Sequence, residues 1–163
     1  MCTSVSFEEV LQAIRTHAFE ASTYPLILSL EVHCTSSYQQ TMAELLNRVL
    51  GKLLVLPSDS AFASTRSLPS PLSLQCRILI KGSLADDAIK GKIFAKELRD
   101  LCFLSTVPLT RLDERDVQEM ASCPASHVKQ AKYSDMLNKT QHHLVRVYPD
   151  GFQVPPLQLH KPH

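Results

Sequence analysis

The fold of this chain is most strongly constrained by short apolar runs that are separated by amphipathic stretches. Residues 26–30 read Leu-Ile-Leu-Ser-Leu, with almost none of the polar alternation of a half-exposed strand. A run of this kind is typical of a strand buried on both faces in a parallel sheet. Similar runs at 52–56, 77–80, 98–107 and 144–148 predict further strands. We therefore expect a sheet whose strands are spread along the whole chain.

The stretches between these runs show the spacing of apolar residues that is typical of helices. Residues 6–18 place apolar side chains on one face, and their first turn has the S-x-x-E form of a capping box. Residues 36–50 repeat this pattern, with glutamines three residues after two serines, and are followed by a glycine. A third helix is predicted over 124–138, with proline in its first turn, whereas 114–120 fit no pattern.

Strands that alternate with helices predict the α/β fold class, in which parallel strands are flanked by helices. The Ser- and Pro-rich residues 57–71 are expected to form a loop and the charged residues 83–96 a connector. The last residues, 153–163, have little pattern and are expected to form a loose tail. The pattern by itself does not distinguish an open sheet from a barrel.

The charge balance excludes a global electrostatic field that would attract nucleic acid. Lysine and arginine together number 17 against 16 aspartates and glutamates, so any anion binding must be local. No apolar stretch reaches the roughly 18 to 20 residues that a membrane-spanning helix needs. The five cysteines form no CxxC pair, and we expect reduced, mostly buried thiols in a cytosolic protein.

Five strings of this chain carry a resemblance to a known family. They are Phe7–Ile14, Tyr24–Cys34 (YPLILSLEVHC), Leu68–Pro71 with Ile78–Gly82, Glu97–Leu101 and Thr140–Pro149. In these strings and in their order the chain resembles the catalytic core of phosphoinositide-specific phospholipase C, and the longest, Tyr24–Cys34, is similar to that family's YPVILSLENHC string. An unrelated α/β domain would need all of these strings to coincide by chance.

The resemblance implies a partial TIM-type (β/α) barrel with parallel strands, split into an X and a Y half. Residues 1–82 would form the later part of the X half, 83–96 the connector, 97–152 the early Y half and 153–163 the tail. The implied reaction is calcium-dependent hydrolysis of phosphatidylinositol 4,5-bisphosphate to diacylglycerol and inositol trisphosphate in intracellular lipid signalling. The implied protein is cytoplasmic and peripheral to the plasma membrane, where it meets its substrate.

Three charged residues at or near the ends of predicted strands match functional positions of the family. Glu31 matches a calcium ligand that also takes the proton of the inositol 2-hydroxyl, which suits the chemistry of a carboxylate. Lys81 and Arg146 match residues that bind substrate phosphates, and an arginine can do so through paired hydrogen bonds. By residue type alone, each could also be a solvated or salt-bridged surface side chain.

Two serines match the family less closely. Ser122 corresponds to a phosphate-binding serine in one alignment of the strings, and Ser83 replaces the second lysine of the family's IKGK string. The family's catalytic histidines would lie upstream of Phe7, and His33 is interpreted as a structural neighbour of Glu31. We therefore expect the chain to be inactive alone, as a truncated segment of the enzyme. The alternative is a catalytically dead short product that binds inositol phosphates or acts as an interaction module.

Overall fold

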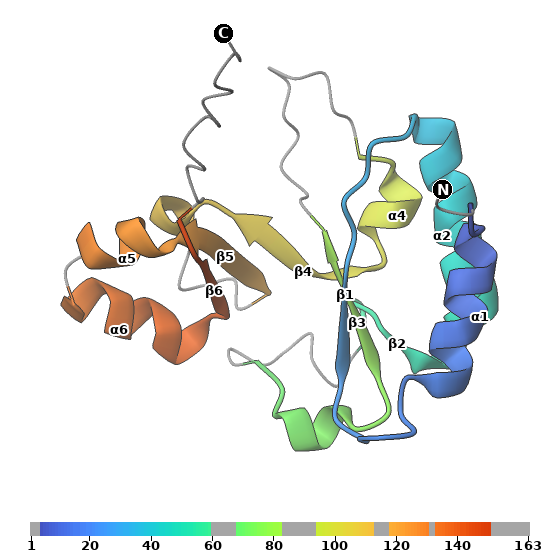
Figure 1. Cartoon of the computed structure of the whole chain (residues 1–163), viewed down its shortest axis with the longest axis horizontal. Coiled ribbons are helices and arrows are strands. Elements are labelled where there is room, and N and C mark those ends of the chain that lie inside the picture. Colours follow the sequence, from blue (N-terminus) through green and yellow to red (C-terminus); the bar gives the residue numbers. More distant parts are fainter. Residues whose placement is uncertain (1–3, 60–67, 83–93, 113–117, 131–132, 151–163) are drawn as a thin grey trace, which may run out of the picture.

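The strands of the described residues form one six-stranded sheet in which every pairing is parallel. The computed structural model describes residues 4–59, 68–82, 94–112, 118–130 and 133–150. The strands pair in the order β1-β3-β4-β5-β6, and the short β2 also pairs with β3. Their bounds are β1 Leu26–Ser29, β2 Leu54–Val55, β3 Ile78–Gly82, β4 Cys102–Val107, β5 Glu119–Pro124 and β6 Val145–Tyr148. The sheet curls from β1 to β6 (Figure 1), which confirms the predicted partial (β/α) barrel.

Two groups of helices flank this curled sheet (Figure 1). The first group, on the side of β1 and β3, contains α1 (Phe7–His17), α2 (Ser36–Leu50) and the short α4 (Lys96–Arg99). The second, beside β5 and β6, contains α5 (Ala125–Gln130) and α6 (Tyr133–His142). Short 3₁₀ turns occupy Gly51–Leu53, Pro71–Leu74 and Leu109–Arg111.

The predicted capping box at the start of α1 is confirmed. The Ser6 hydroxyl accepts a hydrogen bond from the Glu9 amide at 3.2 Å, and the Ser6 amide donates to the Glu9 carboxylate at 2.8 Å. These bonds satisfy donors that the first turn of a helix otherwise leaves unpaired. Near the other end of α1, the Arg15 guanidinium donates to the Val49 carbonyl in the last turn of α2 at 2.6 Å. Arg15 thereby joins the two helices at a carbonyl that the last turn of α2 leaves without a donor from its own helix.

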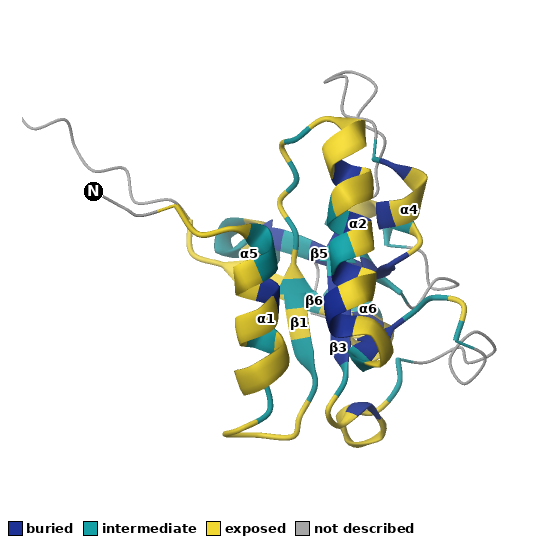
Figure 2. Cartoon of the chain, turned by 90° about the vertical axis from the view of Figure 1, so that its right-hand side faces the viewer, coloured by how far each residue is buried: buried dark blue, intermediate teal, exposed yellow. Residues whose placement is uncertain are grey.

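Apolar side chains are buried on both faces of the sheet. The face covered by α1, α2 and α4 buries a core that includes Leu11, Leu46, Ile78, Ile80 and Leu98. The opposite face, which we call the inner face, buries a second core. Its members are Val55, Leu74, Leu79, Phe103, Leu104 and Met120. Strand side chains alternate between faces, and β3 accordingly sends Ile78 and Ile80 to one core and Leu79 to the other. In Figure 2 buried positions recur along α2 while the outward surface of α1 is exposed.

The structure confirms the predicted second helix but corrects how it is capped. α2 begins after Thr35, which makes no side-chain capping bond, so the second capping box is wrong. The glutamine that would have closed it, Gln39, is buried and bonds to other segments instead. A capping-box pattern describes only neighbouring residues, and tertiary contacts redirect the side chain here.

Further corrections concern the second half of the chain. Residues 98–107 were predicted as a strand, but Leu98 and Arg99 belong to α4, and the strand begins at Cys102. The strand β5 occupies part of the unclassified stretch and runs to Pro124, where a helix was predicted to begin. Instead of one helix over 124–138, the structure has α5 and α6. A proline can end a strand or open a helix, so its local signal fits both positions. Among the described thiols, Cys102 and Cys123 are buried as expected, whereas Cys76 is exposed.

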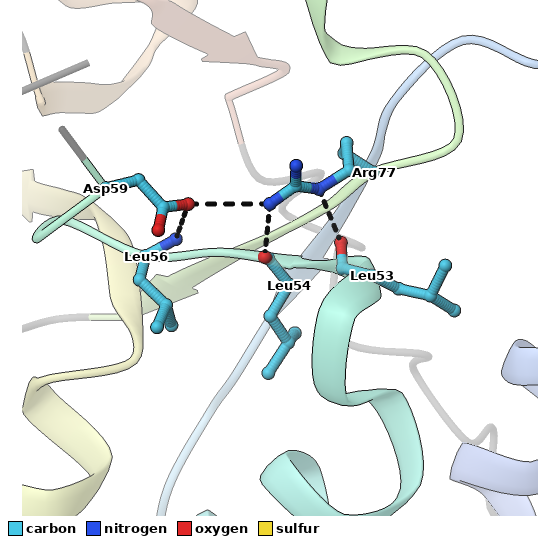
Figure 3. A network of polar contacts seen from close by, with 5 residues as sticks. All are labelled: Leu53, Leu54, Leu56, Asp59 and Arg77. Carbon is cyan, nitrogen blue, oxygen red and sulfur yellow. Dashed lines mark hydrogen bonds and ion pairs between the residues drawn. The ribbon is translucent and has the colours of Figure 1, made fainter. Parts of the chain in front are cut away.

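An arginine holds the two-residue strand β2 against β3 (Figure 3). The Arg77 guanidinium donates to the Leu54 carbonyl at 2.7 Å and to the Leu53 carbonyl at 3.4 Å. It also lies 3.4 Å from the Asp59 carboxylate, which accepts the Leu56 amide at 3.1 Å. A strand this short has few ladder hydrogen bonds, so these side-chain bonds supply part of its attachment.

Some predicted features lie outside the described residues. These are Ser83, residues 83–93 of the predicted connector, residues 60–67 of the predicted loop, and the predicted tail from 153 onward. Among the residues that the structure describes, no helix is long and apolar enough to cross a membrane.

Candidate functional site

The parallel strands bring their carboxyl ends to one edge of the sheet. Glu31 follows β1 in the chain and Lys81 is the last residue but one of β3, so both lie at this edge. Arg146 is the second of the four residues of β6 and lies farther from the carboxyl end of its strand. Lys81 stands opposite Ser29 in the register of β1 and β3, and its ammonium group donates to the Ser29 hydroxyl at 3.1 Å. The lysine head is therefore held at the strand end by a neighbouring strand.

The charges of Arg146 and Glu31 both affect the pKa of Lys81. Burial is the largest cause that lowers the pKa of Lys81 below its ordinary value, and the Arg146 cation lowers it further, whereas the Glu31 carboxylate raises it. Electrostatic influence between exposed groups falls off over about 10 Å at ordinary ionic strength. The structure thus brings together three residues that are far apart in the sequence.

Arg146 and Ser122 form a pair across neighbouring strands. They are opposite each other in the register of β5 and β6, so their side chains leave the same face of the sheet. Ser122 follows Met120 by two residues, and Lys81 follows Leu79 by two, which assigns them to the inner face by strand alternation. The Arg146 guanidinium carbon lies 5.9 Å from the centre of the Tyr148 ring, a distance at which the ring attracts the cation.

The Ser122 hydroxyl oxygen is buried, yet it has no hydrogen-bond partner in the described part of the chain. A buried hydroxyl without a partner is unfavourable by about 1–3 kcal/mol, so native proteins seldom keep one without a reason. Beside an arginine, such a hydroxyl can donate to an anion that the guanidinium also binds. The pair therefore has the chemistry of an anion subsite.

Glu31 is the carboxylate of this region, and it is exposed to solvent. Calcium takes six to eight oxygen ligands. Within the described ranges, no group of three or more His, Cys, Asp or Glu residues is placed to hold a metal ion. The cations Lys81 and Arg146 also make this region more favourable for anions than for a cation. The described residues alone do not fit a calcium centre.

The histidines have other environments. His143 is buried, and its Nδ1 lies 3.3 Å from the Lys139 carbonyl, which indicates a structural role. His33, His127 and His142 are exposed. A cavity of about 450 Å³ near the amino ends of β4 and β5 is lined by none of the predicted site residues. Ser29 was missed by the sequence interpretation, although the one polar residue in the run 26–30 could have indicated it.

The comparisons with known proteins agree in sequence and in structure. Residues 1–83 match the family described as phosphatidylinositol-specific phospholipase C, X domain. The 1-phosphatidylinositol 4,5-bisphosphate phosphodiesterase delta-1 of Homo sapiens is 49% identical over 81 residues, which are 49% of this chain and 10% of that protein. The gamma-2 enzyme of Rattus norvegicus is 46% identical over 79 residues, 48% of this chain and 6% of that protein. The eta-2 enzyme of Homo sapiens is 36% identical over 113 residues, 64% of this chain and 8% of that protein.

Solved structures extend the similarity over most of the fold. The crystal structure of L. pealei PLC21 matches with a TM-score of 0.74 and 28% sequence identity, over 94% of this chain and 23% of that one. The chain thus spans a tenth or less of the length of the relatives named above. The sequence match covers half of the chain, and the parallel (β/α) architecture agrees with it. The chain therefore belongs to the phosphatidylinositol-specific phospholipase C family.

Proposed function

We propose that this chain carries the phosphate-binding part of a phosphoinositide phospholipase C barrel. The reaction of the whole barrel would be calcium-dependent hydrolysis of phosphatidylinositol 4,5-bisphosphate to diacylglycerol and inositol trisphosphate. The observation that supports this most strongly is the grouping of Lys81, Arg146 and the unpartnered Ser122 hydroxyl on the inner face of the parallel sheet. Two cations and a hydrogen-bond donor suit a ring that bears several phosphates.

Each residue has a distinct part in this proposal. Arg146 and Ser122 would hold one phosphate between two neighbouring strands, and Lys81 would neutralise a second phosphate as a point charge. Glu31 would accept the proton of the inositol 2-hydroxyl as that oxygen attacks the phosphorus. Ser83, outside the described residues, would offer a weaker contact than the lysine that the family has there.

Calcium is part of this proposal only because the chain belongs to a family whose reaction is expected to depend on it. Glu31 would be one of its ligands, and the remaining ligands would have to come from outside the described residues. The leaving diacylglycerol oxygen also needs a proton donor, and none of the described histidines is assigned to that role. We therefore propose that the chain alone does not turn over substrate.

A second candidate function is binding of inositol phosphates without catalysis. It is favoured by the same cations, because Lys81 and Arg146 need no calcium to attract a phosphate. Such a module would bind the soluble product or the lipid headgroup at a membrane surface. Both functions predict binding, and only the first predicts that catalysis returns in a complete barrel.

The decisive experiment pairs turnover with binding. Release of inositol phosphate from phosphatidylinositol bisphosphate vesicles is measured with calcium and with chelator, for the chain and for Glu31→Gln. Binding of inositol 1,4,5-trisphosphate is measured by calorimetry for Lys81→Met and Arg146→Met, with the exposed Lys52→Met as the matched control. We expect no turnover, and about tenfold or more weaker binding in each site variant alone. Equal binding by all variants would refute the site, and calcium-dependent turnover lost in Glu31→Gln would refute the proposed inactivity.

A further inference from the structure

Gln39 is a buried polar side chain whose amide joins three segments of the fold. It lies in the first turn of α2 and is 5% exposed. Its Nε2 donates to the Cys34 carbonyl at 3.1 Å, in the segment that follows β1. Its Oε1 accepts the Ala95 amide at 2.7 Å, at the residue that precedes α4. A buried amide with both ends bonded is a strong constraint, because neither segment can move without leaving a polar group unpaired.

The bond to Cys34 bears on Glu31. Residues 30–35 form neither helix nor strand, and Glu31 lies between two anchors of this segment. The first anchor is the Leu30 amide, which donates to the Lys81 carbonyl at 2.9 Å and continues the pairing of β1 with β3. The second is the Cys34 carbonyl on Gln39. Between them, Val32 packs against the helix-side core, so the backbone next to Glu31 is held at a third point.

We infer that Gln39 is a positioning residue that holds the Cys34 end of the segment and thereby keeps Glu31 in place at the carboxyl ends of β1 and β3, next to Lys81. The role assigned to Glu31 rests on the proposed function, but the geometry does not. Glu31 is solvent-exposed and makes no hydrogen bond or ion pair with the part of the chain that the structure describes, so the backbone on either side sets its position. Without the bond at Cys34, this backbone loses its anchor on the carboxyl-terminal side and keeps the one at Leu30.

Two variants separate the two bonds of the amide. Gln39→Glu keeps an oxygen that accepts the Ala95 amide and loses the donor to Cys34, whereas Gln39→Leu loses both. Gln40→Leu is the matched control, because Gln40 is exposed and bonds only weakly to Glu97, at 3.3 Å. If Gln39→Leu does not fold, Gln39→Glu still tests the anchor at Cys34.

The first readout is amide hydrogen exchange. For Gln39→Glu we expect the Leu30 amide, which donates to the Lys81 carbonyl beside Glu31, to exchange about tenfold faster, with the Ala95 amide still protected. Gln39→Leu should release both amides, and Gln40→Leu neither. Unchanged exchange at Leu30 in Gln39→Glu would overturn the inference.

The second readout reports the direction of Glu31 rather than the stability of the fold. A carbodiimide joins a carboxylate to a nearby amine without a spacer, and mass spectrometry gives the yield of the Glu31–Lys81 cross-link. The Lys96–Asp100 ion pair, at 2.5 Å, is the internal standard in the same sample. We expect the yield relative to that standard to fall about threefold or more in Gln39→Glu and to stay unchanged in Gln40→Leu. An unchanged relative yield in both Gln39 variants would refute the positioning role, and Gln39 would then only join the segments of Cys34 and Ala95. The two proposals can fail separately. If the uncross-linked chain does not bind inositol trisphosphate but the cross-link yields change as expected, the proposed function is refuted and the inference stands.

Discussion

Replacement of Ser122 by alanine separates binding from stability. The Ser122 hydroxyl is buried beside Arg146 and has no hydrogen-bond partner among the described residues. Most buried polar groups stabilise the fold through their bonds, and their removal weakens it. Here the group to be removed makes no such bond, so the free protein should not be weakened by its loss.

The magnitude follows from the burial of the hydroxyl. An unpartnered buried hydroxyl is unfavourable by about 1–3 kcal/mol, and alanine fills nearly the same volume. We expect Ser122→Ala to leave the free energy of unfolding unchanged or to raise it by up to about 2 kcal/mol, allowing for loss of contacts. In the complex, a bond from the hydroxyl to a phosphate contributes about 1.5–3 kcal/mol, so its loss should weaken inositol trisphosphate binding by about 10- to 100-fold.

Urea unfolding and calorimetric titration of the same samples measure the two effects. Ser126→Ala is the matched control, because the Ser126 hydroxyl donates to the Asp150 carboxylate at 2.6 Å, a bond that holds the pKa of Asp150 below its ordinary value. This variant should lower the free energy of unfolding and leave binding unchanged. A clear loss of stability in Ser122→Ala, or binding equal to that of the unchanged protein, would refute the reasoning.

Other predictions concern the charged and thiol groups. Burial, and after it the charge of Arg146, hold the pKa of Lys81 below 10.5. Inositol trisphosphate binding, measured by calorimetry, should therefore weaken as the pH rises through that lowered pKa. In Lys81→Arg the binding should be retained over the same pH range. The unfolded chain binds this proton more tightly, so Lys81 should make the free energy of unfolding rise with pH between the lowered pKa and 10.5, as urea unfolding of the chain and of Lys81→Met can test. Arg77→Met should lower the urea-unfolding free energy by about 1–2 kcal/mol, because the bonded carbonyls lose their donor; a change below about 0.3 kcal/mol would contradict that role. Burial raises the pKa of Cys102 to about 12, so iodoacetamide at neutral pH should label the exposed Cys76 and not Cys102 in mass spectra of the folded chain.

Local patterns predicted the first half of the fold well. The capping box and apolar spacing of α1 depend on residues within one or two turns, and the structure has both. The run 26–30 gives β1, and the run 77–80 gives most of β3. These patterns are informative because a helix or a buried strand is set largely by neighbouring residues.

Long-range packing explains the failures. α4 is too short to be stable by itself and exists because Leu98 is buried against α2. β5 carries a mixed run, Glu-Met-Ala-Ser-Cys-Pro, whose strand form depends on pairing with β4 and β6. Neither signal can be read from a short window of sequence.

The sequence by itself determined the family, the alternation of strands and helices, and the charged residues at the strand ends. Only the tertiary structure decided that Ser122 faces the same side as Arg146, that Ser29 holds Lys81, and that Gln39 joins three segments. The reason is physical. Register between parallel strands is set through long crossover connections, and a shift of one residue would turn each side chain to the other face.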